Sequence, residues 1–201
     1  MNKEIEIKIK LTDVQLDALT AWLKEHAHYA GEKKIVDYYV DNPNDSFYTQ
    51  APQGFTDALQ FLRVRVVDEQ QFFKTRKQRT VDAQGNTVDV QEDEFPLADY
   101  REELERLKQQ GFTDQIVIRK TRDVFLTNGT LEIAIDRFED NVLPTVVELE
   151  HRKERRDVAK GMKDIYAFLR RVGITSFTQF DRGVICMFLN PDYNFEKEVV
   201  L

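Results

Sequence analysis

The opening residues of the chain alternate strictly between apolar and charged side chains. In residues 3–10 (KEIEIKIK), three isoleucines alternate with Glu4, Glu6, Lys8 and Lys10. Successive side chains of a β-strand point to opposite faces of a sheet, so this period of two predicts a strand with one apolar and one charged face. Such a strand requires a sheet whose apolar face is covered by other elements.

Similar alternation returns in later segments of the chain. An Asp68-Glu69 turn joins two of the predicted strands, and Asn128-Gly129 gives a strong hairpin signal between two others. Residues 41–58 are expected to form an irregular loop. The further strands are predicted over residues 34–40, 59–67, 70–79, 86–94, 115–127, 130–138 and 144–150.

Three segments change to the helical period of 3.6 residues. Thr12 with Gln15 resembles a capping box, Pro96 lies near one helix start, and Gly111 and Gly173 follow two of the helix ends. Residues after 174 are expected to pack against the rest. The helices are predicted over residues 12–28, 96–110 and 153–172.

These elements amount to about eight strands and three helices in a single domain over residues 1–201. The order contains no regular βαβ repeat, so a doubly wound fold is excluded. The predicted class is α+β with mostly antiparallel strands.

The polar faces of the predicted strands are charged rather than mixed. Their members include Arg63, Arg65, Lys74, Arg76, Lys120, Arg122, Glu132, Asp136, Glu148 and Glu150. One interpretation is a solvated outer face with surface ion pairs. The other is a closed barrel whose apolar faces pack outward on the helices and whose charged faces line the interior. Alternation alone does not decide between the two.

The mixture of charges favours one kind of chemistry. Arginine and lysine bind phosphate oxygens, and carboxylates hold Mg²⁺ or Mn²⁺, which bridges to the phosphates. Together they suit a polyphosphate bound with metal, since neither set is tolerable when buried alone.

The order of these residues resembles the CYTH superfamily, the triphosphate tunnel metalloenzymes. Over about residues 1–172, the similar motifs are Glu4-Ile5-Glu6-Ile7-Lys8 (E-x-E-x-K), Arg63-Val64-Arg65 (R-x-R), Lys74, Lys120-Thr121-Arg122 (K-x-R), Asp136-Arg137 and Glu148-Leu149-Glu150. The loop at 41–58 and the segment 173–201 depart from the family pattern.

The resemblance implies a closed antiparallel barrel of about eight strands, a triphosphate tunnel, with helices outside. Residues 173–201 would be an extension that packs on it. The implied cofactor is Mg²⁺ or Mn²⁺. Metal-site candidates are Glu4, Glu6, Asp136, Glu148 and Glu150, with Glu94 as a further tunnel carboxylate; triphosphate contacts are Lys8, Arg63, Arg65, Lys74, Lys120 and Arg122.

Three functions are compatible with these residues. The first is hydrolysis of inorganic triphosphate, thiamine triphosphate or a nucleoside triphosphate. The second is a class IV-type adenylate cyclase that forms cyclic AMP and pyrophosphate from ATP. The third is a polyphosphate- or nucleotide-binding sensor without catalysis. No residue is assigned as the general base.

Composition restricts partners and compartment. The net charge of −7 with a pI near 5.1 argues against non-specific nucleic-acid binding. No run approaches the ~20 apolar residues of a membrane span, the start has no apolar signal region, and Cys186 is the only cysteine. A cytoplasmic monomer or homodimer that acts on a small triphosphate is expected.

Several conspicuous residues are assigned structural or surface roles. Trp22 is next to Leu23 on a predicted helix, which favours a core position over a base-stacking platform. The spacing of the histidines does not indicate a metal site, and Cys186 lies in an apolar run. This set comprises Trp22, His26, His28, His151 and Cys186.

Overall fold

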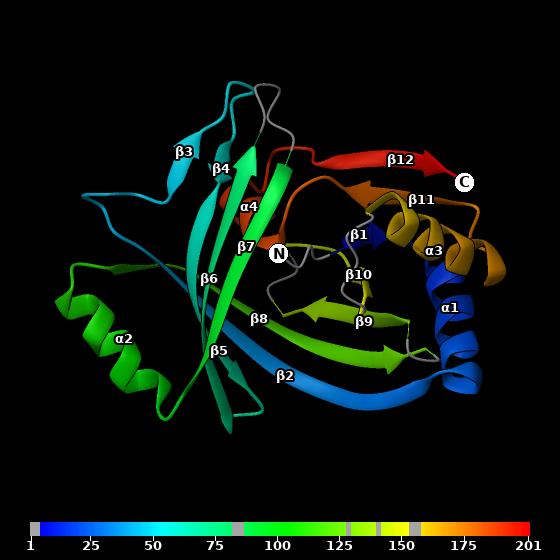
Figure 1. The fold of residues 1–201 in the computed structure, drawn as a ribbon, viewed down its shortest axis with the longest axis horizontal. Helices are drawn as coiled ribbons and strands as arrows, with labels where there is room; N and C mark the ends of the chain where they lie inside the picture. The colour runs from blue at the N-terminus through cyan, green and yellow to red at the C-terminus, as the bar shows by residue number, and fades with distance from the viewer. Residues whose placement is uncertain (1–4, 82–86, 128–129, 140–141, 153–157) are drawn as a thin grey trace. The chain divides into compact units, whose positions relative to one another are not determined.

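The structure is a computed structural model that combines antiparallel strands with helices. The described part of the chain contains twelve strands and four helices (Figure 1), and none of these helices is long and apolar enough to cross a membrane. The α+β class is confirmed. The described residues are 5–81, 87–127, 130–139, 142–152 and 158–201.

The chain divides into two compact units. The first unit contains residues 1–33, 121–183 and 194–201, and the second contains residues 34–120 and 184–193. Two long strands, β2 (His28–Asp41) and β8 (Thr113–Leu126), have residues in both. The single domain expected from the sequence stays a prediction.

The first unit contains five further strands and two helices. Hydrogen-bonded neighbours follow the order β12-β11-β1-β10-β9-β8. The elements are β1 (Glu6–Lys10), α1 (Asp13–His26), β9 (Leu131–Phe138), β10 (Val146–His151), α3 (Val158–Arg171), β11 (Ser176–Phe180) and β12 (Glu196–Val200).

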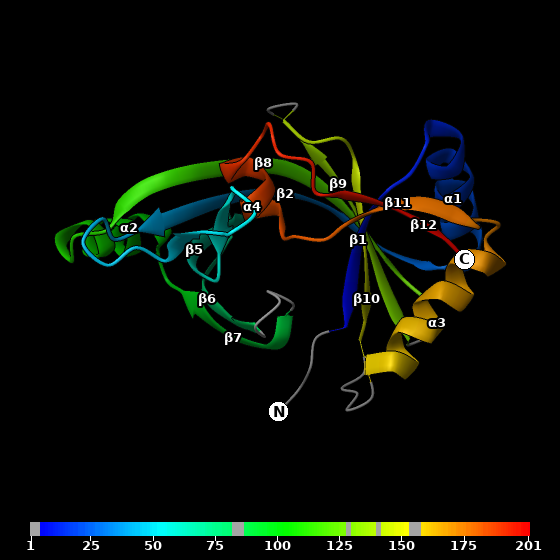
Figure 2. The same cartoon turned by 90° about the horizontal axis from the view of Figure 1, so that it is seen from above.

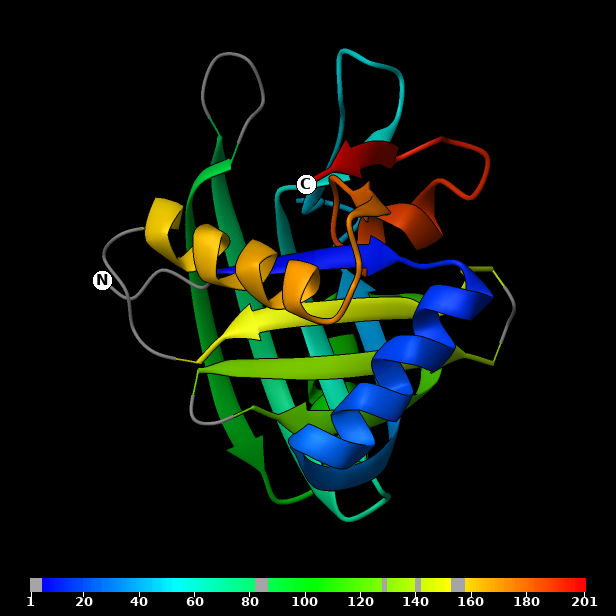
Figure 3. The same ribbon diagram turned by 90° about the vertical axis from the view of Figure 1, so that its right-hand side faces the viewer.

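The core of the first unit lies between the sheet and its helices. Isoleucine, valine and leucine from alternate positions of β1, β9 and β10 pack on α1 and α3, both on the same side of these strands (Figure 3). Ile9, Leu23 and Ile165 are each 0% exposed. The prediction that apolar strand faces pack on amphipathic helices is confirmed in this unit.

Helix α3 approaches β1 closely at Gly161. A Cβ atom added at this glycine would lie 2.6 Å from the Cδ1 atom of Ile5. The missing side chain therefore allows the helix to lie directly on the isoleucine face of the sheet. At the start of α1, the capping box of Thr12 and Gln15 is present as predicted.

The strands of the second unit follow the order β8-β2-β5-β6-β7, with β3 and β4 as a separate pair. Its elements are β3 (Tyr48–Gln50), β4 (Thr56–Ala58), β5 (Gln60–Val67), β6 (Gln71–Val81), β7 (Thr87–Leu97), α2 (Tyr100–Gln109) and α4 (Val184–Leu189).

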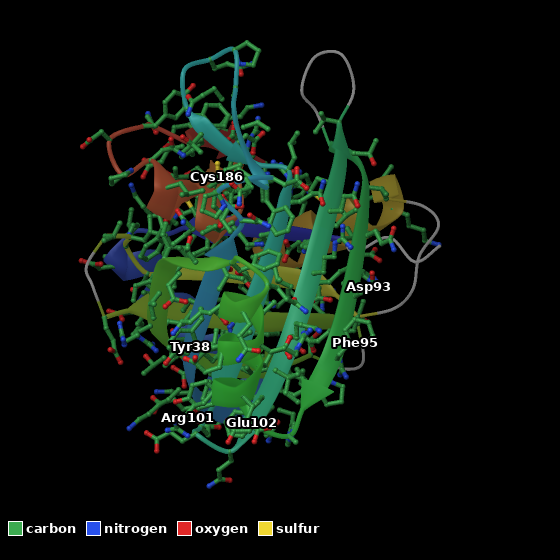
Figure 4. All side chains as sticks on the ribbon, turned by 90° about the vertical axis from the view of Figure 1, so that its left-hand side faces the viewer. Tyr38, Asp93, Phe95, Arg101, Glu102 and Cys186 are labelled. Atoms are coloured by element: carbon green, nitrogen blue, oxygen red, sulfur yellow. The ribbon has the colours of Figure 1, made fainter. Side chains whose placement is uncertain are left out.

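Helix α2 covers one face of the second unit. Leu107 packs against Val40, Leu62 and Val64, and the ring of Tyr100 stacks on Tyr38 at a centroid distance of 5.8 Å. In Figure 4, Tyr38 lies beside this helix. Tyr38 and Val40 of β2 and Leu62 and Val64 of β5 therefore face α2. Asp37, Arg63 and Arg65 lie on the other face of these strands.

The tight turn predicted between two strands is confirmed. Asp68 and Glu69 have φ values of 51° and 58°, as expected for the two central residues of a type I′ hairpin turn. The hairpin signal Asn128-Gly129 lies outside the described residues, as do parts of the strands and helix predicted over 3–10, 86–94 and 153–172.

Two expectations about loops and helix starts are wrong. The segment 41–58 contains the paired strands β3 and β4 rather than only irregular loop. Pro96 belongs to β7, opposite Phe73, and α2 starts later with Asp99 as its N-cap. Proline fits β7 because this strand is the last in the sheet order, where a missing N–H is tolerated.

The residues after Gly173 are ordered elements. Strand β11 pairs with β1 and with β12, and Figure 2 shows β11 and β12 side by side. Helix α4 belongs to the second unit, where the side chain of Asn190 donates to and accepts from the backbone of Thr56. The prediction that this tail packs is confirmed by the burial of Phe177, Phe180 and Met187.

Candidate functional site

An acidic cluster lies on the polar face of the first unit. Strand register places Glu6 opposite Glu150, Glu150 opposite Glu132, and Lys8 opposite Glu148. Directly opposed side chains share one face of the sheet. The acidic cluster is defined as Glu6, Lys8, Arg122, Glu132, Asp136, Glu148 and Glu150.

Arg122 anchors one end of the acidic cluster. Its guanidinium donates to both oxygens of Asp136 at 2.6 Å and to Glu148 at 2.6 Å. Asp136 is completely buried. Burial alone would lower the pKa of Arg122, but Glu148 and Asp136 outweigh it and raise the pKa well above its usual value. Arg122 is therefore a permanent cation.

Lys8 connects the two carboxylates of the neighbouring strands. Its Nζ donates to Glu6 and lies 3.8 Å from Glu148. The side chains of Glu6, Lys8 and Glu148 are 25%, 14% and 14% exposed. They are therefore shielded, yet each retains some access to solvent.

A basic cluster lies on the polar face of the second unit. Asp37 accepts from Arg65 at 2.6 and 2.8 Å and lies 3.8 Å from Arg63. Burial alone would raise the pKa of Asp37, but the two arginines, with help from Lys120, hold it below its usual range. The basic cluster is defined as Asp37, Arg63, Arg65, Thr75, Lys77, Glu92, Glu94 and Lys120.

Thr75 holds Arg63 and Glu94 in one row. The three residues are directly opposed across β5, β6 and β7. The Thr75 hydroxyl accepts from Arg63 at 3.1 Å and donates to Glu94 at 3.0 Å. Glu94, considered a possible tunnel carboxylate from the sequence, is thus connected to Arg63 through Thr75.

The predicted grouping of Lys74 with Arg63 and Arg65 is wrong. Lys74 is opposite Val64 and therefore lies on the other face of β6, where its Nζ is 3.1 Å from Glu103 of α2. Thr75 and Lys77 of β6 lie on the face of Arg63. Lys77 lies 2.8 Å from Glu92, so this lysine occupies the position expected for Lys74.

The structure places the remaining predicted residues as follows. Lys120 and Arg122 point to the same face of β8, with Lys120 only 3% exposed. Arg76 is exposed. Glu4 lies outside the described residues.

Sequence reasoning missed Asp37, Thr75 and Lys77 as cluster members. Asp37 had a signal, because it is the polar position in the alternating segment 34–40. Thr75 and Lys77 alternate as regularly as Lys74 and Arg76 do, so only the pairing of β6 with β5 selects between the two sets.

The acidic cluster has the donor chemistry of a divalent metal site. Mg²⁺ and Mn²⁺ prefer oxygen ligands, and Mg²⁺ commonly takes one or two carboxylates with phosphate and water as its other ligands. In the described part of the chain, no three acidic, histidine or cysteine side chains are gathered to hold a metal by themselves. The residues fit a metal that is completed by substrate oxygens.

Comparison with solved structures shows the fold. A protein from Pyrococcus horikoshii is 19% identical, with a TM-score of 0.69, over 93% of this chain and 98% of that one. A putative adenylyl cyclase from Hippeastrum, described as having a dominant triphosphatase activity, is 17% identical, with a TM-score of 0.66, over 96% and 100%. A putative adenylate cyclase from Vibrio parahaemolyticus is 16% identical, with a TM-score of 0.64, over 86% and 89%.

Comparison with sequence families is more direct. No curated protein matches the chain. The CYTH domain matches residues 2–184, which include both clusters and extend beyond the segment in which the motifs were identified. The chain therefore belongs to the CYTH domain family.

Proposed function

We propose that this chain is a metal-dependent enzyme that hydrolyses a phosphoanhydride bond in the triphosphate group of a small molecule. The observation that carries the proposal is the excess of carboxylates in the acidic cluster. Glu6, Glu150 and Glu132 are opposed across three strands, and like charges directly opposite are destabilising. A bound cation would relieve that repulsion.

Glu6, Glu148 and Glu150 would hold the metal, with Glu4 and Asp136 as further candidates. When bound, Mg²⁺ or Mn²⁺ supplies positive charge that polarises phosphate oxygens. Arg122 holds Asp136 and Glu148 in fixed orientations through its hydrogen bonds. Lys8 lies close enough to Glu6 and Glu148 to balance their charge or to contact a phosphate.

Arg63, Arg65, Lys77 and Lys120 would bind the phosphate oxygens, with Lys8 and Arg122 as further contacts. Arginine binds phosphate with two parallel hydrogen bonds, which fixes position as well as charge. Asp37 orients the two arginines before substrate arrives, and such preorganisation is the main contribution that phosphoryl transfer needs. The closed barrel implied by the family resemblance belongs to this proposal.

Hydrolysis is preferred to cyclisation as the reaction. It requires only a water molecule at the terminal phosphorus, whereas cyclisation also requires a site for the base and the ribose. The Hippeastrum protein shares only the fold at this identity, yet its described triphosphatase activity supports testing hydrolysis first.

The experiment measures products from three substrates. Purified protein is incubated with Mg²⁺ or Mn²⁺ and, separately, with inorganic triphosphate, thiamine triphosphate and ATP, and phosphate, pyrophosphate and cyclic AMP are quantified. Glu6→Gln tests the acidic cluster. Glu196→Gln is the matched control. Glu196 of β12 forms an ion pair at 2.6 Å with Lys10, which lies on the same strand as Glu6, but Glu196 lies outside the acidic cluster.

Phosphate release that requires metal, is lost in Glu6→Gln and survives in Glu196→Gln is the expected result. Cyclic AMP with pyrophosphate from ATP would replace hydrolysis with the cyclase. Binding of triphosphate without turnover of any substrate would overturn the enzyme assignment and favour a sensor.

A further inference from the structure

A pocket lies in the first unit, on the side of the sheet that α1 and α3 cover. Its volume is about 340 Å³, and it lies between the C-terminal halves of α1 and α3 and the start of β9. Leu131 lines it, whereas the next residue, Glu132, belongs to the acidic cluster on the opposite face of β9. The sheet therefore separates the pocket from the acidic cluster. The volume of the pocket is in the range of small-molecule sites.

Two aromatic side chains form part of the pocket wall. Trp22 of α1 meets Phe168 of α3 edge to face, at a centroid distance of 5.5 Å and an angle of 78°. Its indole also contacts the His26 ring at 4.7 Å. Ala167, next to Phe168, contributes only a methyl group to the lining. This combination suits a flat ring, because aromatic faces and edges give it favourable contacts.

The pocket is lined by one carboxylate, Asp164, and one arginine, Arg171. Asp164 lies with its Oδ2 atom 3.4 Å from the Nε2 atom of His151, whose side chain is fully buried. Arg171 lines the same pocket, and no carboxylate of the described residues pairs with it. Arg171 is thus a cation that can accept an anionic partner.

We propose that this pocket binds a flat aromatic molecule that carries one anionic group, a carboxylate or a phosphate. The ring would lie against Trp22 and Phe168, and the anion would receive the Arg171 guanidinium, a charge-assisted and often bidentate contact. The site is independent of triphosphate hydrolysis, since none of its residues belongs to either cluster.

A simpler role for Arg171 provides the matched control. Basic residues in the last turn of a helix offset its dipole, and α3 ends with both Arg170 and Arg171. Only Arg171 lines the pocket. Arg170→Gln therefore removes the same helix-end charge without removing the proposed ligand contact.

Trp22 is the only tryptophan of the chain, so its fluorescence reports directly on the pocket. Adenosine monophosphate and benzoate are titrated as the phosphate and carboxylate probes, and adenosine serves as the uncharged comparison. We expect a saturable change in emission with at least one anionic probe. Its affinity should fall about tenfold in Arg171→Gln, in line with one charged hydrogen bond, and should be unchanged in Arg170→Gln.

The stronger of the two anionic probes identifies the preferred anion. Equal binding of adenosine and adenosine monophosphate, with no response to benzoate, would overturn the proposal. So would the absence of any saturable change up to about 10 mM, or equal affinities for Arg171→Gln and the unchanged protein. Urea unfolding of Arg171→Gln verifies that the variant is folded, and Glu6→Gln should keep its binding.

Discussion

Arg122 and Asp136 form a two-point ion pair between β8 and β9, with both hydrogen bonds at 2.6 Å. A second arginine–aspartate pair joins the same two strands, where Arg137 lies 2.6 Å from Asp123. The two pairs differ in burial, since the side chains of Arg122 and Asp136 are 14% and 0% exposed whereas those of Arg137 and Asp123 are 44% and 18% exposed.

This difference predicts unequal costs for the same substitution. Asp136→Asn removes the buried carboxylate that accepts two hydrogen bonds from the part-buried Arg122 guanidinium, and should lower the free energy of unfolding by about 2 to 4 kcal/mol. Asp123→Asn, at the more exposed pair, should cost less, about 1 kcal/mol, and part of that cost comes from the Tyr29 hydroxyl, which donates to Asp123 at 2.7 Å. Urea unfolding of both variants measures the two losses, and similar values would show that burial does not govern this pair.

The ion pairs of Asp37 predict a pH dependence of stability. Because its pKa is lower in the folded protein than in the unfolded chain, where it is about 3.9, the folded state binds fewer protons. Its stabilisation is then complete above about pH 5 and is lost as the pH falls below about 4. The pKa values of Glu92 and Glu103 are lowered too, so a comparison that cancels them is needed.

The comparison is with Asp37→Asn, which retains Glu92 and Glu103. The difference in unfolding free energy between the two proteins should be constant from about pH 5 to 7 and should shrink toward about pH 3. Urea unfolding across this range measures it. A difference that stays unchanged in acid would show that Asp37 is not held ionised by Arg63 and Arg65.

The two faces of β6 predict different effects for its neighbouring lysines. Lys77→Met should raise the KM for triphosphate at least tenfold, since one charged contact to phosphate contributes about 1.5 to 3 kcal/mol. Lys74→Met should leave KM nearly unchanged, because its partner is Glu103 of α2. Steady-state kinetics of both variants test the strand register. A larger effect for Lys74 would restore the original assignment.

The glycine in α3 predicts a destabilising alanine substitution. Alanine normally favours a helix over glycine by about 1 kcal/mol. At Gly161, however, its methyl group would lie 2.6 Å from Cδ1 and 3.1 Å from Cγ2 of the buried Ile5. Gly161→Ala should therefore lower the unfolding free energy by about 1 to 2 kcal/mol.

A second substitution, at Ile5, should restore the stability that Gly161→Ala loses. Ile5→Val removes the Cδ1 atom, so the double variant should recover most of the loss, apart from about 1 kcal/mol for the deleted methyl group. Thermal or urea unfolding of the single and double variants forms a double-mutant cycle. Independent effects of the two changes would rule out the predicted contact.

The sequence predicted most strands because alternation is strict in β1 and clear in the central parts of β5, β9 and β10. It could not predict the faces of β6. Phe72, Lys74 and Arg76 alternate with Phe73, Thr75 and Lys77, and both sets mix apolar and polar residues. Only the pairing of Thr75 with Arg63 selects one set for the basic cluster.

The short strands β3 and β4 were missed for a different reason. Each has three residues, too few for a period to be visible, and their pairing depends on contacts such as that between Asn190 and Thr56, which are 134 positions apart. Pro96 misled the helix assignment because proline is as acceptable in the last strand of a sheet as at a helix start.

The division of the chain has a consequence for its synthesis. The backbone passes between the two units four times, at residues 33–34, 120–121, 183–184 and 193–194. Helix α4 completes the second unit and β12 completes the first, and of the described elements these two are translated last. When only residues 1–120 have left the ribosome, each unit still lacks some of its strands or helices. The chain is therefore expected to complete its folding late. It should depend on chaperones more than a protein whose domains follow one another in sequence.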